Sequence, residues 1–211
     1  MSFVKLDLQT FPRRQHLAYF SALAYPYVGV TNNVDVTELV QFCKQQKHSF
    51  YLLFMHAAAL AADGVPELRQ RIRNGEVVEY SECPTSHTEL LDNGTYAYCT
   101  LYHHMALKAY LAQAESARAQ CRLNGGIEED ADSESMYFIS TLPWLAYTGL
   151  IQPVAGGEDC NPRITWGKFQ PDAHGRQQLP VTLLAHHGLV DGIHIARFYE
   201  NLEKELQALV R

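Results

Sequence analysis

The sequence predicts an α/β protein, built as a two-layer sandwich of a mixed β-sheet and helices. Segments with helical periodicity and segments rich in β-branched and aromatic residues both occur, without the strict alternation of βαβ units. The composition is that of a globular chain, with 47% hydrophobic and 19% charged residues. At 211 residues the chain can bury a sizeable core, and we expect a single domain over residues 1–211.

The first helices are predicted from their start and stop signals. Asp35 is followed three residues later by Glu38, which resembles a capping box and predicts a short helix that starts there. The apolar run at 50–63 is too short to span a bilayer, so we expect a buried helix that stops near Gly64. Pro66 favours the first turn of a further helix.

Two longer helices are predicted in the second half of the chain. Residues 106–123 are rich in strong helix formers. Near the end of the sequence, apolar residues recur at alternating steps of four and three, which predicts an amphipathic helix with one stripe facing a core. The residues of this stripe are Ile195, Tyr199, Leu202, Leu206 and Leu209.

Strands are predicted where β-branched and aromatic residues gather between turn residues. The predicted strands are 75–82, 95–102, 136–140, 163–170 and 179–187. The acidic stretch at 128–135 is expected to be a solvated loop.

Charge and cysteine usage narrow the function classes. The chain has 17 Lys and Arg against 23 Asp and Glu, a net charge of −6, and no basic stripe, which argues against nucleic-acid binding. The five cysteines are odd in number and none has CxxC spacing, so free buried thiols in a reducing compartment are expected. The first residues lack the apolar core of a signal peptide. We therefore expect a soluble, cytoplasmic protein that does not bind a membrane.

The segment LLAHHGLVDGIHIARF, at 183–198, ends a strand-like run in two histidines followed by an Asp-Gly pair. Side chains alternate along a strand, so His186 and His187 are expected on opposite faces. This argues against one metal held by His186, His187, Asp191 and His194, and we expect no metal. A histidine at the end of an apolar strand stays largely neutral, as a general base requires. Taken alone, such a pair is more often structural than catalytic.

Several motifs together make the sequence resemble a known family. HHGLVDG fits the HHxxxDG motif of coenzyme A-dependent acyltransferases. Further similar segments occur in the same order, namely FPRRQHLAYF, HSFYLLFMHAAALA, PELRQRIRNGEVVEYSE, ISTLPW and ITWGKFQ. Nearly the whole chain is thus similar to chloramphenicol acetyltransferases of the trimeric type. The resemblance implies a mixed-sheet two-layer sandwich of the coenzyme A-dependent acyltransferase type, assembled as a homotrimer with each site at a subunit boundary.

The resemblance also implies a reaction and its catalytic residues. The chain would transfer the acetyl group of acetyl-CoA to a hydroxyl of chloramphenicol, which is an antibiotic-resistance activity. His187, the second histidine of the motif, would be the general base. Ser140 of ISTLPW would donate a hydrogen bond to the tetrahedral oxyanion, and Thr165 would support the transition state through water. Without the resemblance, Ser140 reads as an ordinary hydroxyl at a strand end.

Supporting roles follow from the same resemblance. Asp191 matches an aspartate that forms a structural salt bridge to an arginine near the start of the chain. Arg13 matches that arginine by position, with the neighbouring Arg14 as the alternative. His186 is then a supporting residue and not the base.

Two binding regions are implied as well. Coenzyme A is expected near Tyr51, Lys168 and Phe169, where Lys168 would meet phosphate charge and Phe169 would stack on the adenine. The expected acceptor pocket consists of Tyr19, Phe20, Ala24, Val28, Tyr96, Tyr98 and Gln152. Four of these residues depart in size or polarity from those usual in the family, namely Ala24, Val28, Tyr98 and Gln152.

Other interpretations of the sequence stay open. The chain could be an O-acetyltransferase for a different hydroxyl acceptor, or a trimeric coenzyme A-binding protein without catalysis, although both His187 and Ser140 are present. Dihydrolipoyl acyltransferase catalytic domains have a related histidine motif, but no lipoyl domain or linker occurs here. A serine hydrolase would need a GxSxG elbow, which the sequence lacks.

Overall fold

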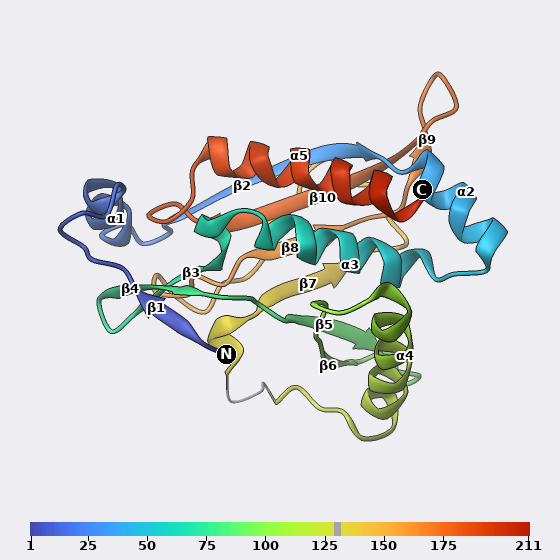
Figure 1. The fold of residues 1–211 in the computed structure, drawn as a ribbon, viewed down its shortest axis with the longest axis horizontal. Helices are drawn as coiled ribbons and strands as arrows, with labels where there is room; N and C mark the ends of the chain where they lie inside the picture. Colours follow the sequence, from blue (N-terminus) through green and yellow to red (C-terminus); the bar gives the residue numbers. More distant parts are fainter. Residues whose placement is uncertain (129–131) are drawn as a thin grey trace.

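The computed structural model describes residues 1–128 and 132–211, and these form two β-sheets with helices packed on them (Figure 1). The larger sheet contains β2 (Tyr27–Asp35), β5 (Thr85–Leu90), β6 (Tyr96–Leu101), β7 (Tyr137–Thr141), β8 (Arg163–Trp166), β9 (Gln170–Pro171) and β10 (Gln177–His186). The smaller sheet contains β1 (Phe3–Lys5), β3 (Gln70–Arg73) and β4 (Glu76–Tyr80). The helices are α1 (Arg14–Ser21), α2 (Thr37–Gln46), α3 (Phe50–Asp63), α4 (Leu107–Asn124) and α5 (Gly192–Leu209), with 3₁₀ turns at Pro66–Arg69 and Ser133–Ser135.

The larger sheet is mixed, with strand order β2-β10-β8-β7-β5-β6 and with β9 paired to the start of β10. The pairs β5–β7 and β7–β8 are parallel, whereas the other pairs are antiparallel. β10 is the longest strand and is hydrogen-bonded on both sides, so it is buried along almost its whole length. It therefore holds the histidine pair at a fixed point of the sheet.

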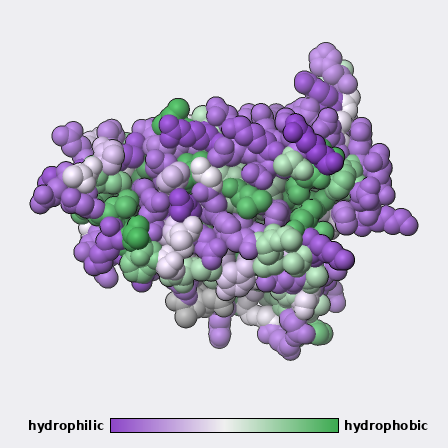
Figure 2. Space-filling view, in the orientation of Figure 1, coloured by the Kyte–Doolittle hydropathy of each residue, from purple (hydrophilic) through white to green (hydrophobic). Residues whose placement is uncertain are grey.

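Helices α3 and α5 lie side by side against one face of this sheet (Figure 1). α3 buries ten of its residues because its sequence is apolar all round, as a helix in the middle of a core must be. α5 buries one stripe and exposes polar residues, so the outer surface of this layer is mainly hydrophilic (Figure 2). The sandwich predicted from the sequence is thus confirmed.

The opposite face of the sheet is covered by the long connection between β7 and β8. The hydroxyl of Tyr147 in this connection donates to the backbone oxygen of Thr165 in β8. The Tyr27 hydroxyl of β2 donates to backbone oxygens at Gly156 and Asp159. The connection is therefore fastened at both ends to the strands that it crosses.

Several predicted elements differ from those in the structure. Asp35 is the last residue of β2 and lies one position before Val36, the N-cap of α2, so the predicted capping box does not form. Its Oδ1 nevertheless accepts from Thr37 N, the first residue of α2, at 2.9 Å. Pro66 starts only one 3₁₀ turn, since the chain then enters β3. The predicted strand at 163–170 is two short strands with a break between them.

Other segments were missed or lie partly outside the described residues. The strands β1, β2, β3 and β5 and the helix α1 were not predicted from the sequence. β5 was not predicted because its buried residues are the polar Thr85, His87 and Glu89, which do not give the apolar alternation of a half-buried strand. The acidic loop predicted at 128–135 includes 129–131, which are outside the described residues. All five cysteines are buried and free, and no described helix combines the length and apolar character of a membrane span.

Candidate active site

His187 lies directly after β10, at the end of the sheet where β2 begins. Its backbone N–H donates to Pro26 O at 2.7 Å, which extends the ladder by one bond. The Nδ1 atom lies 2.9 Å from Val190 O, and because a carbonyl only accepts, Nδ1 carries the proton. The Phe20 ring stacks on the imidazole with centroids 3.9 Å apart. In the neutral ring, Nε2 therefore has a free lone pair and a fixed direction.

Arg13 holds the turn that follows the histidine. Its guanidinium donates to the backbone oxygens of His187 at 2.7 Å and of Gly188 and Val190 at 3.4 Å, and it pairs with Asp191 Oδ2 at 3.1 Å. Asp191 also caps α5, accepting from Gly192 N. The bond from Gly192 N and the Arg13 charge lower the pKa of the Asp191 carboxyl below its usual value.

His186 occupies the opposite tautomer. Gly188 N donates to its Nδ1 at 3.1 Å, and its Nε2 donates to Gly157 O at 3.2 Å. Both ring nitrogens are thus used, and burial lowers the pKa of the ring so that it stays neutral. A Cβ at residue 188 would lie within 3.0 Å of the His186 ring, so only glycine fits that position.

Ser140 lies near the end of β7, in a row of hydroxyl residues that runs across the sheet. Ser140 is opposite Thr165 in β8, and Thr165 is opposite Thr182 in β10. Thr182 in turn shares a 2.7 Å hydrogen bond with Thr31 of β2. The Gln152 amide donates to Thr165 Oγ1 at 2.7 Å and so fixes that hydroxyl from the β7–β8 connection.

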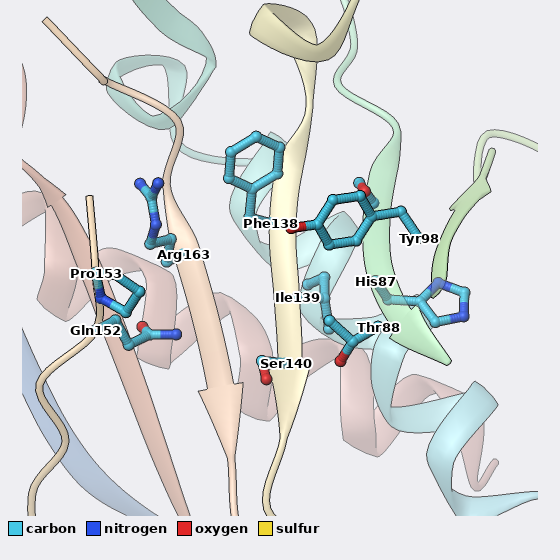
Figure 3. A pocket seen from close by; sticks show the side chains of 10 residues that line it. His87, Thr88, Tyr98, Phe138, Ile139, Ser140, Gln152, Pro153 and Arg163 are labelled. Carbon is cyan, nitrogen blue, oxygen red and sulfur yellow. The ribbon is translucent and has the colours of Figure 1, made fainter. Parts of the chain in front are cut away.

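A cavity of about 270 Å³ opens beside Ser140 (Figure 3). Its walls come from β5, β6, β7, β8 and the β7–β8 connection, and the lining residues are Ser86, His87, Thr88, Tyr98, Phe138, Ile139, Ser140, Gln152, Pro153 and Arg163. Gln152 lies on one side of Ser140 and Thr88 on the other (Figure 3). The cavity is therefore lined by the aromatic rings of Tyr98 and Phe138 and by several hydrogen-bonding groups.

His187 and Ser140 are far apart within one chain. Two strand spacings of about 4.8 Å separate Ser140 from Thr182, and five residues at about 3.3 Å each separate Thr182 from His187. The two side chains are thus roughly 19 Å apart, whereas groups that share one reacting centre must lie within about 3 Å of it.

The acceptor residues expected from the sequence divide between the same two places. Tyr19, Phe20, Ala24 and Val28 lie at the His187 end, and Tyr96, Tyr98 and Gln152 lie at the Ser140 end.

Of the residues expected to bind coenzyme A, Tyr51 lies in the first turn of α3 and Phe169 packs on that turn. The Tyr51 ring lies between Trp166 and the Arg118 guanidinium, with a ring–cation distance of 5.0 Å. Phe169 packs on Phe50 at 5.3 Å between centroids. Lys168 is exposed, and its backbone N–H donates to Leu145 O.

A charged network that was not predicted from the sequence lies behind the cavity. Glu89 of β5 is buried and accepts from Arg118 at 2.8 and 3.0 Å and from Arg122 at 2.5 and 2.8 Å. Burial raises the pKa of Glu89, but His87 at 3.6 Å and the two guanidiniums outweigh it, so the carboxyl pKa is strongly lowered. His87 lines the cavity and neither of its ring nitrogens has a hydrogen-bond partner among the described residues. Glu89 lies between two predicted strands, and nothing in the sequence around it indicates that it is buried or paired.

Comparison with solved structures defines the class. A chloramphenicol acetyltransferase structure has a TM-score of 0.84 and 23% identity, covering 96% of this chain and 100% of its own. A dihydrolipoamide acetyltransferase of Azotobacter vinelandii has a TM-score of 0.69 and 19% identity, covering 92% of this chain and 86% of its own. The fold is therefore that of the coenzyme A-dependent acyltransferases.

Sequence comparison then gives the family. A family model for chloramphenicol acetyltransferase matches residues 1–203, and the chain belongs to the chloramphenicol acetyltransferase family. Chloramphenicol acetyltransferase 2 of Escherichia coli is 26% identical over 206 residues, which cover 96% of each chain. The resemblance inferred from the motifs is confirmed, and with it the assignment of the chain as an acyltransferase enzyme.

Proposed function

We propose that this chain transfers the acetyl group of acetyl-CoA to a hydroxyl of chloramphenicol, and so confers resistance to the antibiotic. The observation that carries the proposal is the hydrogen bond from His187 Nδ1 to Val190 O, which leaves Nε2 as the proton acceptor. The names of the family and of its relatives support the acceptor and the acetyl donor. The proposal treats residues 1–211 as one catalytic domain.

His187 is the general base of the proposed reaction. Its Nε2 takes the proton of the acceptor hydroxyl as that oxygen attacks the thioester carbonyl of acetyl-CoA. When the tetrahedral intermediate collapses, the carbon–sulfur bond breaks and the imidazolium returns the proton to the leaving thiolate. Arg13 and Phe20 keep the ring in the productive orientation throughout, because they hold its backbone and its face.

Ser140 is the proposed donor to the oxyanion. Its hydroxyl stabilises charge that develops only in the tetrahedral intermediate, and Thr165, fixed by Gln152, supports the same state through water. In the Azotobacter vinelandii dihydrolipoamide acetyltransferase, a serine, a histidine and an asparagine have been investigated for roles in catalysis. That pairing of residue types supports the assignment of Ser140 and His187.

The separation of these two residues supports a site shared between two copies of the chain. A distance of roughly 19 Å within one chain is too long for both to act on one substrate. We therefore propose a homotrimer in which His187 of one subunit faces the Ser140 cavity of the next, with no metal in the catalytic site. The free buried cysteines agree with a cytoplasmic location.

The first experiment measures the reaction itself. Purified protein is mixed with acetyl-CoA and chloramphenicol, free thiol release is followed, and the product is identified by mass. We expect a singly acetylated drug. If a folded trimer that binds acetyl-CoA gives no product at millimolar drug, the acceptor assignment is wrong.

A second experiment tests the shared site. His187→Ala and Ser140→Ala chains are each expected to be nearly inactive, and the two are then unfolded together and refolded as mixed trimers. If one subunit supplies the base and the next supplies the serine, about one quarter of the sites in an equal mixture are intact. Recovered activity near that fraction supports the shared site, whereas no recovery places both residues in one chain.

A different hydroxyl acceptor is the second candidate. Gln152 stands where the family usually has an aliphatic residue, and its buried Oε1 atom has no hydrogen-bond partner in the described part of the chain. Such an atom favours a ligand that brings a donor into the cavity, because an unpaired buried acceptor is costly. Thiol release with a panel of amide-bearing and polyhydroxylated alcohols, compared with chloramphenicol, tests this candidate.

A further inference from the structure

A compact cluster of histidine and carboxylate side chains lies apart from the residues proposed for acetyl transfer. It consists of Asp63, the last residue of α3, and of His103 and His104, which follow β6. Nε2 atoms of both histidines approach one carboxylate oxygen, Asp63 Oδ2, at 2.7 and 2.5 Å. Within 1–128 and 132–211, this is the one group of three such side chains whose ligand atoms lie within 4.8 Å of one another.

The Asp63 carboxylate is largely shielded from solvent and has no permanently charged cation as its partner among the described residues. It is 9% exposed and lies at the C-terminal end of α3, where the helix dipole is unfavourable to negative charge. A buried carboxylate must be paired with a cation or coordinate one. Among the described residues, its only ion-pair partners are His103 and His104, and histidine, unlike lysine or arginine, carries no permanent charge.

A second carboxylate increases the negative charge of the cluster. Glu82 Oε2 lies 3.7 Å from His104 Nε2, and both side chains are partly exposed. A cavity of about 90 Å³ opens beside them, with Glu82, Tyr102, His103 and His104 in its lining. An ion can therefore reach the cluster from solvent, and the two carboxylates attract a divalent cation.

The carboxylate of the cluster is oriented by a contact outside it, and the backbone fixes the turn that carries the histidines. The Tyr137 hydroxyl donates to Asp63 Oδ1 at 2.7 Å, which turns Oδ2 toward the histidines. Met105 N donates to His103 O at 2.8 Å and makes a tight turn, and the two imidazole centroids are 4.5 Å apart. Outer contacts of this kind orient the ligands of metal sites and tune their affinity.

We propose that Asp63, His103 and His104 bind one divalent transition-metal ion, most simply Zn²⁺, with Glu82 or water as the fourth ligand. Two imidazole nitrogens and carboxylate oxygen are a donor set that Zn²⁺ prefers. Ligand atoms around a tetrahedral Zn²⁺ are about 3.3 Å apart, so movements of less than about 1 Å accommodate the ion. The ion ties the end of α3 to the segment after β6 and acts as a structural clip.

This proposal departs from the sequence-based expectation of a chain without metal. That expectation covered the whole chain, but the metal set that it weighed was the one at the end of β10, whose two histidines have their ring nitrogens engaged separately. Asp63 is 40 residues from His103, so no local motif joins the ligands. The proposal is independent of acetyl transfer.

The test is metal binding by the intact protein after dialysis against a chelator and removal of the chelator. Titration with ZnCl₂ by calorimetry is expected to give one equivalent per chain, and CoCl₂ is expected to give the visible bands of a tetrahedral site. Zn²⁺ is also expected to raise the melting temperature by several degrees, because it binds only the folded chain.

Variants separate this site from adventitious binding. His104→Ala removes a partly exposed ligand, and we expect a loss of affinity of about 10-fold or more and no rise in melting temperature. Asp63→Asn is expected to have the same effect on affinity. His174→Ala, which removes an exposed histidine between β9 and β10, is the matched control and is expected to leave binding unchanged.

The proposal is overturned if calorimetry finds no site of one Zn²⁺ per chain with a dissociation constant below about 100 µM. It is also overturned if His104→Ala binds Zn²⁺ as tightly as the unchanged chain does. Circular dichroism of each variant excludes unfolding as the cause of a loss. Should His104→Ala fail to fold, His104→Gln replaces it, and retained affinity together with an unchanged cobalt spectrum in that variant then counts against the proposal.

Discussion

At the residue scale, the two adjacent histidines differ in what their ring nitrogens can do. His186 uses both nitrogens in backbone hydrogen bonds, so it has no lone pair for a substrate proton. His187 uses only Nδ1, and Val190 O fixes which nitrogen carries the proton. Histidine thus has a structural role at position 186, whereas at position 187 it keeps one nitrogen that can accept a proton. Backbone partners, not sequence identity, make the difference.

His187→Ala is expected to lower kcat by about 10²–10⁴, the usual contribution of a positioned general base, without loss of folding. His186→Ala is expected to lower the melting temperature instead, because it leaves Gly157 O and Gly188 N without partners. Steady-state kinetics and thermal melts of both variants check this. If His186→Ala is folded but inactive while His187→Ala retains turnover, the base has been misassigned.

Ser140→Ala is expected to reduce kcat by about 10²–10³ with little change in KM, since the hydrogen bond strengthens only when the oxyanion forms. Initial rates over a range of acetyl-CoA and acceptor concentrations measure the two parameters separately. Ser86→Ala, which removes another hydroxyl from the same cavity wall, is the matched control. A variant whose main defect is a raised KM for acetyl-CoA would give Ser140 a binding role.

At the scale of elements, the start of α5 is fixed by a capping box. The Asp191 side chain accepts from the first turn of the helix, and His194 Nδ1 accepts from Asp191 N at 2.9 Å. Arg13 joins this cap to the turn at His187. The helix, the turn and the end of β10 are therefore tied together, which fixes the direction of the imidazole.

β5 and α4 are joined by the ion network of Glu89, Arg118 and Arg122. The folded-state pKa of Glu89 is lower than its unfolded value near 4.3, so the network stabilises the fold fully above that pH and loses its contribution as the pH falls further. Acid should therefore loosen this edge of the sheet. Because β5 carries part of the cavity wall, the network also supports the site.

Glu89→Gln is expected to cost about 1–3 kcal/mol of unfolding free energy at pH 7, since it removes the charge that both guanidiniums bind. The cost should shrink between about pH 5 and pH 2, because the unchanged chain loses the same interaction on protonation. Urea unfolding at several pH values measures this. Glu115→Gln, at an exposed position of α4, is the control. A cost that is the same at pH 3 and pH 7 would exclude the network as its source.

At the scale of the whole molecule, the arrangement of strands keeps His187 and Ser140 at separate places on the sheet. Neither place is complete by itself, since one offers a base beside aromatic rings and the other offers a hydroxyl beside a cavity. The chain also exposes large apolar side chains, among them Tyr19, Trp144 and Ile151. Such exposure is typical of surfaces that meet another copy.

Light scattering is therefore expected to report about three times the chain mass of 23.9 kDa. The assembly should persist at the dilution used for kinetics, because in the proposed shared site activity requires the boundary between subunits. Mass measured over a range of concentrations, together with activity at the same concentrations, checks this. A fully active monomer would contradict both the trimer and the shared site.

The sequence by itself determined the elements whose signals are local. The apolar run of α3, the amphipathic stripe of α5 and the strand that ends in the histidine pair are all present as predicted. Hydrophobic periodicity suffices there because burial of each element depends on its own residues. The motif around His187 and the similarity along the chain also sufficed to identify the family.

Only the tertiary structure decided which distant residues meet. Strand pairing makes β5 out of a polar segment, and the fold sets Asp63 against His103 and His104 and gives Glu89 its two arginines. It likewise decides which nitrogen of His187 is free, and how far Ser140 lies from it. These outcomes depend on partners far away in the chain, whose positions follow from the packing of the whole sheet and not from local propensity.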